Sequence, residues 1–257
     1  MKASHTGQPP TDPRSYRARP DELSGRVILV TGAGDGIGRA VALALAQHGA
    51  TVVLSGKTVR KLEKTYDEIL AQGSPTPNIA PLDLEKALAG DYDALAEAIE
   101  RMYGRLDGLL HNAGILGQLS PIEHYPMPVW VRVMHVNVTA AFALTQVCLP
   151  LLRKSPDAAV VFTSSSLGRQ GRALWGAYAV SKFAIEGLAQ VLADEMQPTN
   201  VRVNCINPGR ARTSMRLQAY PAEDRGALPE PSELVSPYLF LLGPASRSIN
   251  GQTFDCQ

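Results

Sequence analysis

Tyr178 and Lys182 are the residues of this sequence whose types and spacing most directly suggest chemistry. They stand four positions apart in Tyr-Ala-Val-Ser-Lys, so on a helix both side chains lie on one face. A phenol with its usual pKa of about 10 is a weak acid–base catalyst at neutral pH. A neighbouring ammonium favours the phenolate, so we expect Lys182 to lower the pKa of Tyr178. The pair could then protonate a carbonyl oxygen or deprotonate an alcohol.

Three further polar residues stand where they could join this pair. Ser165 follows a predicted strand at 159–163, and Asn112 follows another at 107–111. Because the carboxyl ends of parallel strands meet at the ligand edge of a sheet, we expect both side chains near one site. Asn137 stands in a mostly apolar helical stretch, where its amide needs a buried partner. The sequence therefore predicts a polar cluster around the tyrosine–lysine pair.

A glycine-rich turn joins the first predicted strand, 26–31, to a helix predicted at 36–48. It reads Thr-Gly-Ala-Gly-Asp-Gly-Ile-Gly, which fits the spacing TGxxxGxG. Glycines allow a tight turn and a close approach of the backbone to a diphosphate, and the helix N-terminus offers free N–H groups. We therefore predict a dinucleotide site, with a purely structural turn as the alternative. Its residues would be Gly32, Asp35, Gly36, Ile37 and Gly38.

The end of the second predicted strand, 51–54, bears on which dinucleotide would bind. An acid at this place usually holds the 2′-hydroxyl of the adenosine ribose. Here no carboxylate is present, and the cation of Lys57 and the hydroxyl of Thr58 suit a 2′-phosphate. The sequence therefore favours NADP(H), with NAD(H) as the alternative. Against this, Lys57 could be a solvated residue at a helix start, and the acid Asp35 would not help a phosphate.

The order of the predicted elements indicates one α/β domain. Of the 257 residues, 45% are hydrophobic, which suffices for a sizeable core. Short β-branched runs alternate with helical periods roughly seven times, which predicts a Rossmann-type, doubly wound parallel sheet flanked by helices over residues 25–257. Residues 1–24 contain four prolines and few apolar residues, so we expect an arm that is mobile or pinned onto the domain. The irregular stretch at 207–232 is expected to cover a ligand.

Composition argues against several classes of function. The formal net charge of +1 and the pI near 7.7 give no global field toward nucleic acid or an anionic membrane. No stretch approaches the roughly 18 uninterrupted apolar residues of a membrane span, and the N-terminus lacks the apolar core of a secretory signal. The three cysteines are far apart and the histidines form no HExxH or HxH pair. We therefore expect no metal site, no disulfide scaffold and a reducing, cytoplasmic compartment.

Taken together, these motifs resemble the short-chain dehydrogenase/reductases, in the form with the TGxxxGxG turn and the YxxxK pair. The resemblance covers residues 23–257 and implies a sheet of seven parallel strands and a homodimer or homotetramer that pairs the long helices. The segments around Ser165 and Tyr178 look like those of the YciK-type bacterial oxidoreductases. The residues that carry the match are Gly32, Gly36, Gly38, Asp83, Asn112, Ala113, Gly114, Asn137, Ser165, Tyr178, Lys182, Pro208 and Gly209.

The family implies a role for each matching residue. Tyr178 would be the acid/base, Lys182 would also hold the nicotinamide ribose, and Ser165 would polarise the substrate carbonyl. Ser165 is preferred to its two serine neighbours because a glycine follows it by three positions, as in the family. Asn137 would position a water that links Lys182 to solvent. The other matches would contact the cofactor: Asp83 and Leu84 at the adenine, Asn112, Ala113 and Gly114 beside the adenosine ribose, and Pro208, Gly209 and Thr213 at the nicotinamide carboxamide.

Five arginines after two of the predicted strands bear on the charge of the substrate. They could surround the mouth of the pocket and bind an anionic group such as a carboxylate, a phosphate or an acyl carrier's phosphopantetheine. Alternatively, they are solvated or pair with nearby acids or with the cofactor phosphates. The arginines are Arg169, Arg172, Arg210, Arg212 and Arg216. An apolar wall of the same pocket could come from Leu116, Leu167, Trp175 and Met215.

The sequence thus predicts an NADP(H)-dependent oxidoreductase that interconverts a small carbonyl and its alcohol by hydride transfer. A dinucleotide-binding sensor or scaffold with little turnover is the alternative from another class of protein. Such a module has no need of a tuned tyrosine, which favours the enzyme. A 3-oxoacyl-carrier reductase is an alternative within enzymes, and only the arginines support it.

Overall fold

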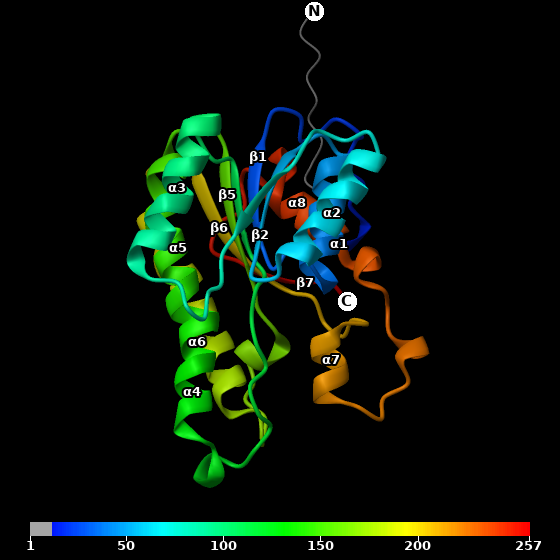
Figure 1. Ribbon diagram of the computed structural model, residues 1–257, viewed down its shortest axis with the longest axis vertical. Coiled ribbons are helices and arrows are strands. Elements are labelled where there is room, and N and C mark those ends of the chain that lie inside the picture. The colour runs from blue at the N-terminus through cyan, green and yellow to red at the C-terminus, as the bar shows by residue number, and fades with distance from the viewer. Residues whose placement is uncertain (1–11) are drawn as a thin grey trace, which may run out of the picture.

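The computed structural model describes residues 12–257, and its centre is a seven-stranded parallel sheet (Figure 1). The strands follow the spatial order β3-β2-β1-β4-β5-β6-β7, so the direction of winding reverses between β1 and β4. This confirms the predicted doubly wound sheet, and ligands of such sheets bind in the crevice at the reversal. The strands are β1 (Val27–Thr31), β2 (Thr51–Gly56), β3 (Asn78–Pro81), β4 (Gly108–His111), β5 (Ala158–Thr163), β6 (Val201–Asn207) and β7 (Thr253–Asp255).

Helices cover both faces of the sheet (Figure 1). One face carries α1 (Gly36–Gln47), α2 (Val59–Ala71) and α8 (Ser236–Leu242), and the other carries α3 (Ala89–Tyr103), α5 (Ala140–Arg153) and α6 (Gly176–Glu195). Strand β1 shows why its apolar run is continuous. Ile28 and Val30 belong to the first core, whereas Val27 and Leu29 belong to the second. Because successive side chains alternate between faces, a strand covered on both sides needs an apolar residue at every position.

A long helical stretch, Met127–Arg153, begins beyond the carboxyl edge of the sheet and runs back along it. It consists of α4 (Met127–Met134), a π-helical turn at His135–Thr139, and α5. By length and composition alone it is the one helix among residues 12–257 that could cross a membrane. Half of the most apolar 18-residue stretch of this helix is buried inside the fold, where the α5 side chains pack in the second core.

The segment just before β1 packs onto the domain. The ring of Tyr16 meets the ring of Phe240 on α8 edge-on, with 5.3 Å between centroids, and Leu23 is completely buried in the first core. Residues 1–11 of the predicted arm lie outside the described part of the chain. Where the arm ends and the catalytic domain begins stays a prediction.

The stretch at 207–232 holds more regular structure than its sequence indicates. It contains α7 (Ser214–Ala219), which begins where the Thr213 hydroxyl accepts a hydrogen bond from the backbone N–H of Arg216 at 3.2 Å. So short a helix leaves too few periodic positions to be recognised in a sequence. In Figure 1, α7 and α4 lie on opposite sides of a gap beyond the carboxyl ends of the strands.

Candidate active site

A cavity of about 1090 Å³ opens at the carboxyl ends of the strands. This is larger than the roughly 300–1,000 Å³ of an ordinary small-molecule pocket. The cavity lies at the reversal of strand order, where a doubly wound sheet binds its ligand. Most of the predicted site residues line it: Gly32, Asp35, Gly36, Ile37, Lys57, Thr58, Asp83, Leu84, Asn112, Ala113, Gly114, Ser165, Tyr178, Lys182, Pro208, Gly209 and Thr213. Gly38 and Asn137 do not.

The glycine turn shapes one end of the cavity. Gly32 has a φ of +68°, in the left-handed region where a side chain would strain the backbone. Helix α1 then begins at Gly36, whose N–H donates to the Asp35 carboxylate at 2.8 Å. The N–H groups of Ile37 and Gly38 precede the first bonded amide of the helix, that of Arg39, which donates to the Asp35 carbonyl at 3.1 Å, and the free Ile37 amide at the cavity is suited to an anion.

Gly38 has a different place from the one predicted. A Cβ on this residue would lie 2.4 Å from the carbonyl oxygen of Gly32 and equally close to the Asn112 amide. Because α1 packs so tightly against the turn, Gly38 permits that contact and stays behind the cavity wall. The structure thus gives Gly38 a packing role, and its direct contact with a cofactor stays a prediction.

Lys61 is a lining residue that the sequence analysis did not single out. Its ammonium lies 2.6 Å from the Asp35 carboxylate, and this hydrogen bond lowers the pKa of Asp35. The acid that argued against a phosphate is therefore paired with a cation. Lys57 and Thr58 lie at the same end of the cavity, just before α2. The position of Lys61 four residues after Lys57 could have marked it as a further cation near this end of the site. A spacing within one segment does not show that Asp35 is its partner.

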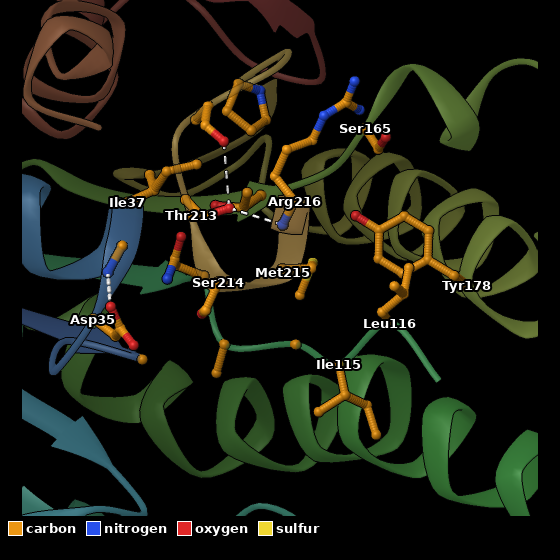
Figure 2. A pocket seen from close by; sticks show the side chains of 18 of the residues that line it. Asp35, Ile37, Ile115, Leu116, Ser165, Tyr178, Thr213, Ser214, Met215 and Arg216 are labelled. Atoms are coloured by element: carbon orange, nitrogen blue, oxygen red, sulfur yellow. Dashed lines mark hydrogen bonds between the residues drawn. The ribbon is translucent and has the colours of Figure 1, made fainter. Parts of the chain in front are cut away.

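Tyr178 and Lys182 meet at the other end of the cavity, on α6. The Lys182 ammonium lies 5.5 Å from the centroid of the Tyr178 ring and donates a hydrogen bond to the Thr163 carbonyl at 2.7 Å. Figure 2 shows the Tyr178 hydroxyl and Ser165 on the same side of the cavity, with Asp35 and Ile37 at the far end. Two of the four catalytic candidates from the sequence, the serine and the tyrosine, are thus neighbours.

The pKa of Tyr178 moves in the opposite direction to the one expected. Burial raises it to about 12, although a hydrogen bond from the Ser165 hydroxyl opposes the rise. Burial also lowers the pKa of Lys182 to about 8. The expectation was wrong because burial disfavours the phenolate and the Lys182 ammonium is directed at a backbone carbonyl. At neutral pH Tyr178 is therefore a neutral phenol, which is a proton donor.

Asn137 lies in the π-helical turn, 4% exposed, and its amide is bonded on both sides. Its oxygen accepts from the Ile115 N–H at 2.8 Å, and its nitrogen donates to the Ile115 carbonyl and the Ser181 hydroxyl, each at 3.0 Å. The buried partner that its position required is therefore present. The side chain ties the loop after β4 to α6, beside the catalytic pair.

Apolar side chains form a wall next to Tyr178. Leu116 and Trp175 are buried there, with the partly buried Leu167 and Met215 packed against them. The structure brings together the four residues proposed for this wall and adds Tyr220, whose ring centroid lies 5.8 Å from that of Trp175. Sequence gave no reason to choose Tyr220, because it enters from the irregular segment after α7.

The five arginines do not all face the cavity. Arg212 pairs with Glu230, and Arg169 pairs with Asp255, so neither lines the pocket and the expectation for these two was wrong. Arg216 does line it, but both arms of its guanidinium meet the Glu223 carboxylate at 2.6 Å.

Two arginines at the mouth have no acidic partner among residues 12–257. Arg172 donates a hydrogen bond to the hydroxyl of Tyr220 at 2.8 Å. The Arg210 guanidinium forms no hydrogen bond or ion pair within this part of the chain. A carboxylate, sulfonate or phosphate entering the cavity would therefore meet two cations without an ion-pair contact, although the Arg210 charge also helps to lower the pKa of the Glu223 carboxyl.

The lining suits a long ligand with an anionic middle and one anionic end. The helix N-terminus would face a diphosphate, Lys57 and Lys61 would face a further phosphate, and the Tyr178 end would face the reacting group. The same lining has one apolar and aromatic wall for a substrate. No group of three or more candidate metal ligands occurs within residues 12–257.

Comparison with known proteins identifies the family to which this fold and site correspond. The family model described as short chain dehydrogenase matches residues 26–224. The sequence is 51% identical over 242 residues to the uncharacterized oxidoreductase YciK of Escherichia coli K12, covering 94% of this chain and 96% of the other.

Solved structures agree with the sequence comparison. A short chain dehydrogenase from Pseudomonas syringae superposes with a TM-score of 0.93 at 55% identity, covering 94% of this chain and 98% of the other. A second structure, from Escherichia coli CFT073 in complex with NADPH, has a TM-score of 0.91 at 51% identity, covering 93% and 99%.

Proposed function

The chain belongs to the short-chain dehydrogenase family of oxidoreductases, and from this premise we propose that it is an NADP(H)-dependent enzyme that reduces a carbonyl to an alcohol, with Tyr178 as the acid. One observation carries the proposal. The neutral Tyr178 hydroxyl and the Ser165 hydroxyl lie together at the end of a dinucleotide-sized cavity. A sensor or scaffold would have no need of this arrangement.

The cofactor is proposed from the lining and from the NADPH bound to the Escherichia coli CFT073 relative. The glycine turn and the first amides of α1 would hold its diphosphate. Lys57 would hold the 2′-phosphate, while Lys61 compensates the Asp35 carboxylate beside it, and the absence of a carboxylate between residues 54 and 58 removes the usual partner of a free 2′-hydroxyl. NADPH, when bound, would supply the hydride.

The protein's own residues would supply the proton and the stabilisation of charge. Tyr178 donates its proton to the carbonyl oxygen, which becomes the alcohol hydroxyl, and the phenolate left behind regains a proton from solvent. Ser165 donates a hydrogen bond to the same oxygen while negative charge develops there. The Lys182 cation holds the cofactor ribose and offsets the charge of the phenolate. Asn137 keeps the loop at Ile115 and the helix of Lys182 in register.

We propose a substrate with an anionic group and an apolar body. Arg172 and Arg210 would bind the anion, and the wall around Leu116 and Trp175 would pack on the body. Arg172→Gln is expected to raise KM about tenfold for a keto acid, which corresponds to about 1.4 kcal/mol, and to spare the matched neutral ketone. Equal effects on both substrates would remove the anion from the proposal. Activity on a 3-oxoacyl group attached to a carrier would place the substrate in that narrower class.

The reaction itself is tested with Tyr178→Phe, which removes the transferable proton and keeps the ring. We expect NADPH to bind with unchanged affinity by calorimetry, while carbonyl reduction falls by roughly 10²–10⁴-fold. Tyr103→Phe, on α3 and outside the cavity lining, is the matched control and should keep full activity. Normal turnover by Tyr178→Phe would show that the assignment of the acid is wrong.

We also propose that the enzyme works in the cytoplasm as a homodimer or homotetramer. Phe142 and Val131 on the long helical stretch and Phe183 on α6 are large apolar side chains about half exposed. Pairing of these helices with a second copy would cover them. Light scattering after size-exclusion chromatography checks the assembly, and a monomer at micromolar concentration would contradict it.

A further inference from the structure

Arg169 lies outside the cavity lining, 40% exposed, between two acids from distant parts of the chain. Its guanidinium pairs with the Asp255 carboxylate on β7, and one of these contacts measures 3.4 Å. The Nε of the same side chain lies 3.9 Å from the Glu186 carboxylate on α6. Since Arg169 is absent from the cavity lining, these contacts do not belong to a substrate site.

Glu186 extends the contact toward the catalytic serine. Its side chain is 8% exposed and accepts a hydrogen bond from the Ser164 hydroxyl at 2.6 Å. A Cβ on Gly168 would lie 2.6 Å from that hydroxyl and 2.9 Å from the Glu186 carboxylate. The turn from Ser164 to Gly168 therefore closes tightly around the Glu186 head group, and Ser165, with its neighbours up to Leu167, lines the cavity.

Asp255 extends the contact toward the other wall of the cavity. Its carboxylate accepts a hydrogen bond from the Asn207 amide at 2.7 Å. The Asn207 oxygen in turn accepts from the backbone N–H of Gly209 at 3.1 Å. Pro208 and Gly209, the turn proposed to face the nicotinamide, are thus fixed by the end of this chain of contacts.

We propose that Arg169 is a positioning residue that holds the Ser165 turn and the Pro208–Gly209 turn in a fixed relation. The chain of contacts runs from Ser164 through Glu186, Arg169, Asp255 and Asn207 to Gly209. One turn would polarise the substrate carbonyl and the other would place the nicotinamide end of NADP(H). The inference therefore rests on the proposed function and adds a residue that touches neither ligand.

The physical reason is that hydride transfer tolerates little misplacement of the carbonyl relative to the nicotinamide. The two turns follow the paired strands β5 and β6, and the Ser164 N–H donates to the Ile206 carbonyl at 2.7 Å at their base. A misplacement of about 1 Å in the reacting geometry can cost roughly 10²-fold in rate, so the turns beyond this backbone link benefit from a second, side-chain support. Arg169 offers three polar nitrogens in a rigid plane, which can engage Glu186 and Asp255 at once. A lysine has a single ammonium and could retain only one of the two acids.

The test compares two ligands that differ only in the nicotinamide. Calorimetry measures the Kd of NADPH and of 2′-phosphoadenosine 5′-diphosphoribose for wild type and Arg169→Gln. If Arg169 positions the Pro208–Gly209 turn, the variant should bind NADPH about tenfold more weakly, about 1.4 kcal/mol, and bind the shorter ligand as wild type does. Its rate of carbonyl reduction should fall by roughly 10²-fold. Arg169→Lys should recover part of the NADPH affinity.

Two further variants keep the test decisive. Lys154→Gln removes the cation of the Lys154–Glu100 pair, whose side chains are 50% and 52% exposed, and should change neither affinity nor rate. Asp255→Asn breaks the same chain of contacts at the Asp255 side chain, which is 48% exposed. It should reproduce the effects of Arg169→Gln, and it replaces that variant as the test if Arg169→Gln folds poorly. Because both act through one pair, the double variant should be no weaker than either single variant.

Each result has a defined meaning. Equal weakening of both ligands, or unchanged binding and rate in Arg169→Gln and Asp255→Asn, overturns the positioning role. A wild-type protein that reduces no carbonyl, together with the selective loss of NADPH affinity, overturns the proposed reaction and keeps the role of Arg169 at the nicotinamide turn. The two proposals therefore fail separately.

Discussion

Asp157 provides a test of what holds the opposite edge of the sheet together. It directly precedes β5, and its carboxylate meets Arg26 at 2.9 Å, Arg247 at 3.2 Å and Arg202. The Asp157 side chain is 7% exposed and that of Arg202 is 5% exposed. Burial lowers the pKa of Arg202 to about 10 although Asp157 opposes this shift. The Asp157 carboxylate therefore offsets part of the cost of burying this charged guanidinium.

The perturbation is Asp157→Asn, which keeps the shape and removes the charge. Loss of one partner of a buried ion pair costs about 3–5 kcal/mol, because the other charge stays buried without compensation. For a chain of this length, about 1 kcal/mol shifts Tm by roughly 2 °C, so Tm should fall by roughly 6–10 °C. NADPH affinity at 25 °C should be unchanged, because Asp157 lies at the edge of the sheet away from the cavity.

The assay is thermal unfolding followed by circular dichroism, with Glu100→Gln as the control. Glu100 belongs to an exposed pair, so its loss should cost at most about 1 kcal/mol. Burial alone would raise the pKa of Asp157, but the charges of Arg202 and Arg26 hold it below its usual value. The ionised Asp157 carboxylate therefore stabilises the folded protein at every pH above its pKa in the unfolded chain. This stabilisation is lost as the pH falls through its lower pKa in the folded protein. A Tm within about 2 °C of wild type at pH 7 would refute the argument.

Three other predictions concern the site. The rate of reduction should fall as pH rises through about 8, where Lys182 loses its charge while Tyr178 stays protonated, and a flat pH–rate profile up to pH 10 would contradict this. Gly38→Ala should abolish measurable NADPH binding in calorimetry, because its Cβ would lie 2.4 Å from the Gly32 carbonyl and displace the turn; wild-type affinity would count against it. Leu174 is exposed and has a φ of +74°, a left-handed conformation that strains any residue with a side chain. Leu174→Gly should therefore raise the free energy of unfolding in urea titrations by about 0.5–1 kcal/mol. A decrease would show that the loop bears no strain.

Much of the fold could be predicted because its signals are local. The apolar run of β1 predicts a strand covered on both faces, and α2 shows a clear helical period. The π-helical turn at His135–Thr139 and the six residues of α7 were not predicted. The first contains Asn137, whose partners Ile115 and Ser181 come from distant segments, and the second is too short for periodicity to reveal it.

The sequence by itself determined the motif residues and the edge of the sheet at which they gather. Spacing along one helix places Tyr178 beside Lys182, and strand alternation brings Ser165 and Pro208 to the same edge. These relations follow from the geometry of helices and parallel sheets, so no knowledge of distant contacts is needed.

Only the tertiary structure decided which charges are compensated and by what. It paired Lys61 with Asp35, directed Arg169 to Asp255 and left Arg172 facing the cavity. It also reversed the expected direction of the Tyr178 pKa. Charge pairing and burial depend on segments that approach each other only after folding, and the balance between desolvation and a nearby charge changes over a few ångströms.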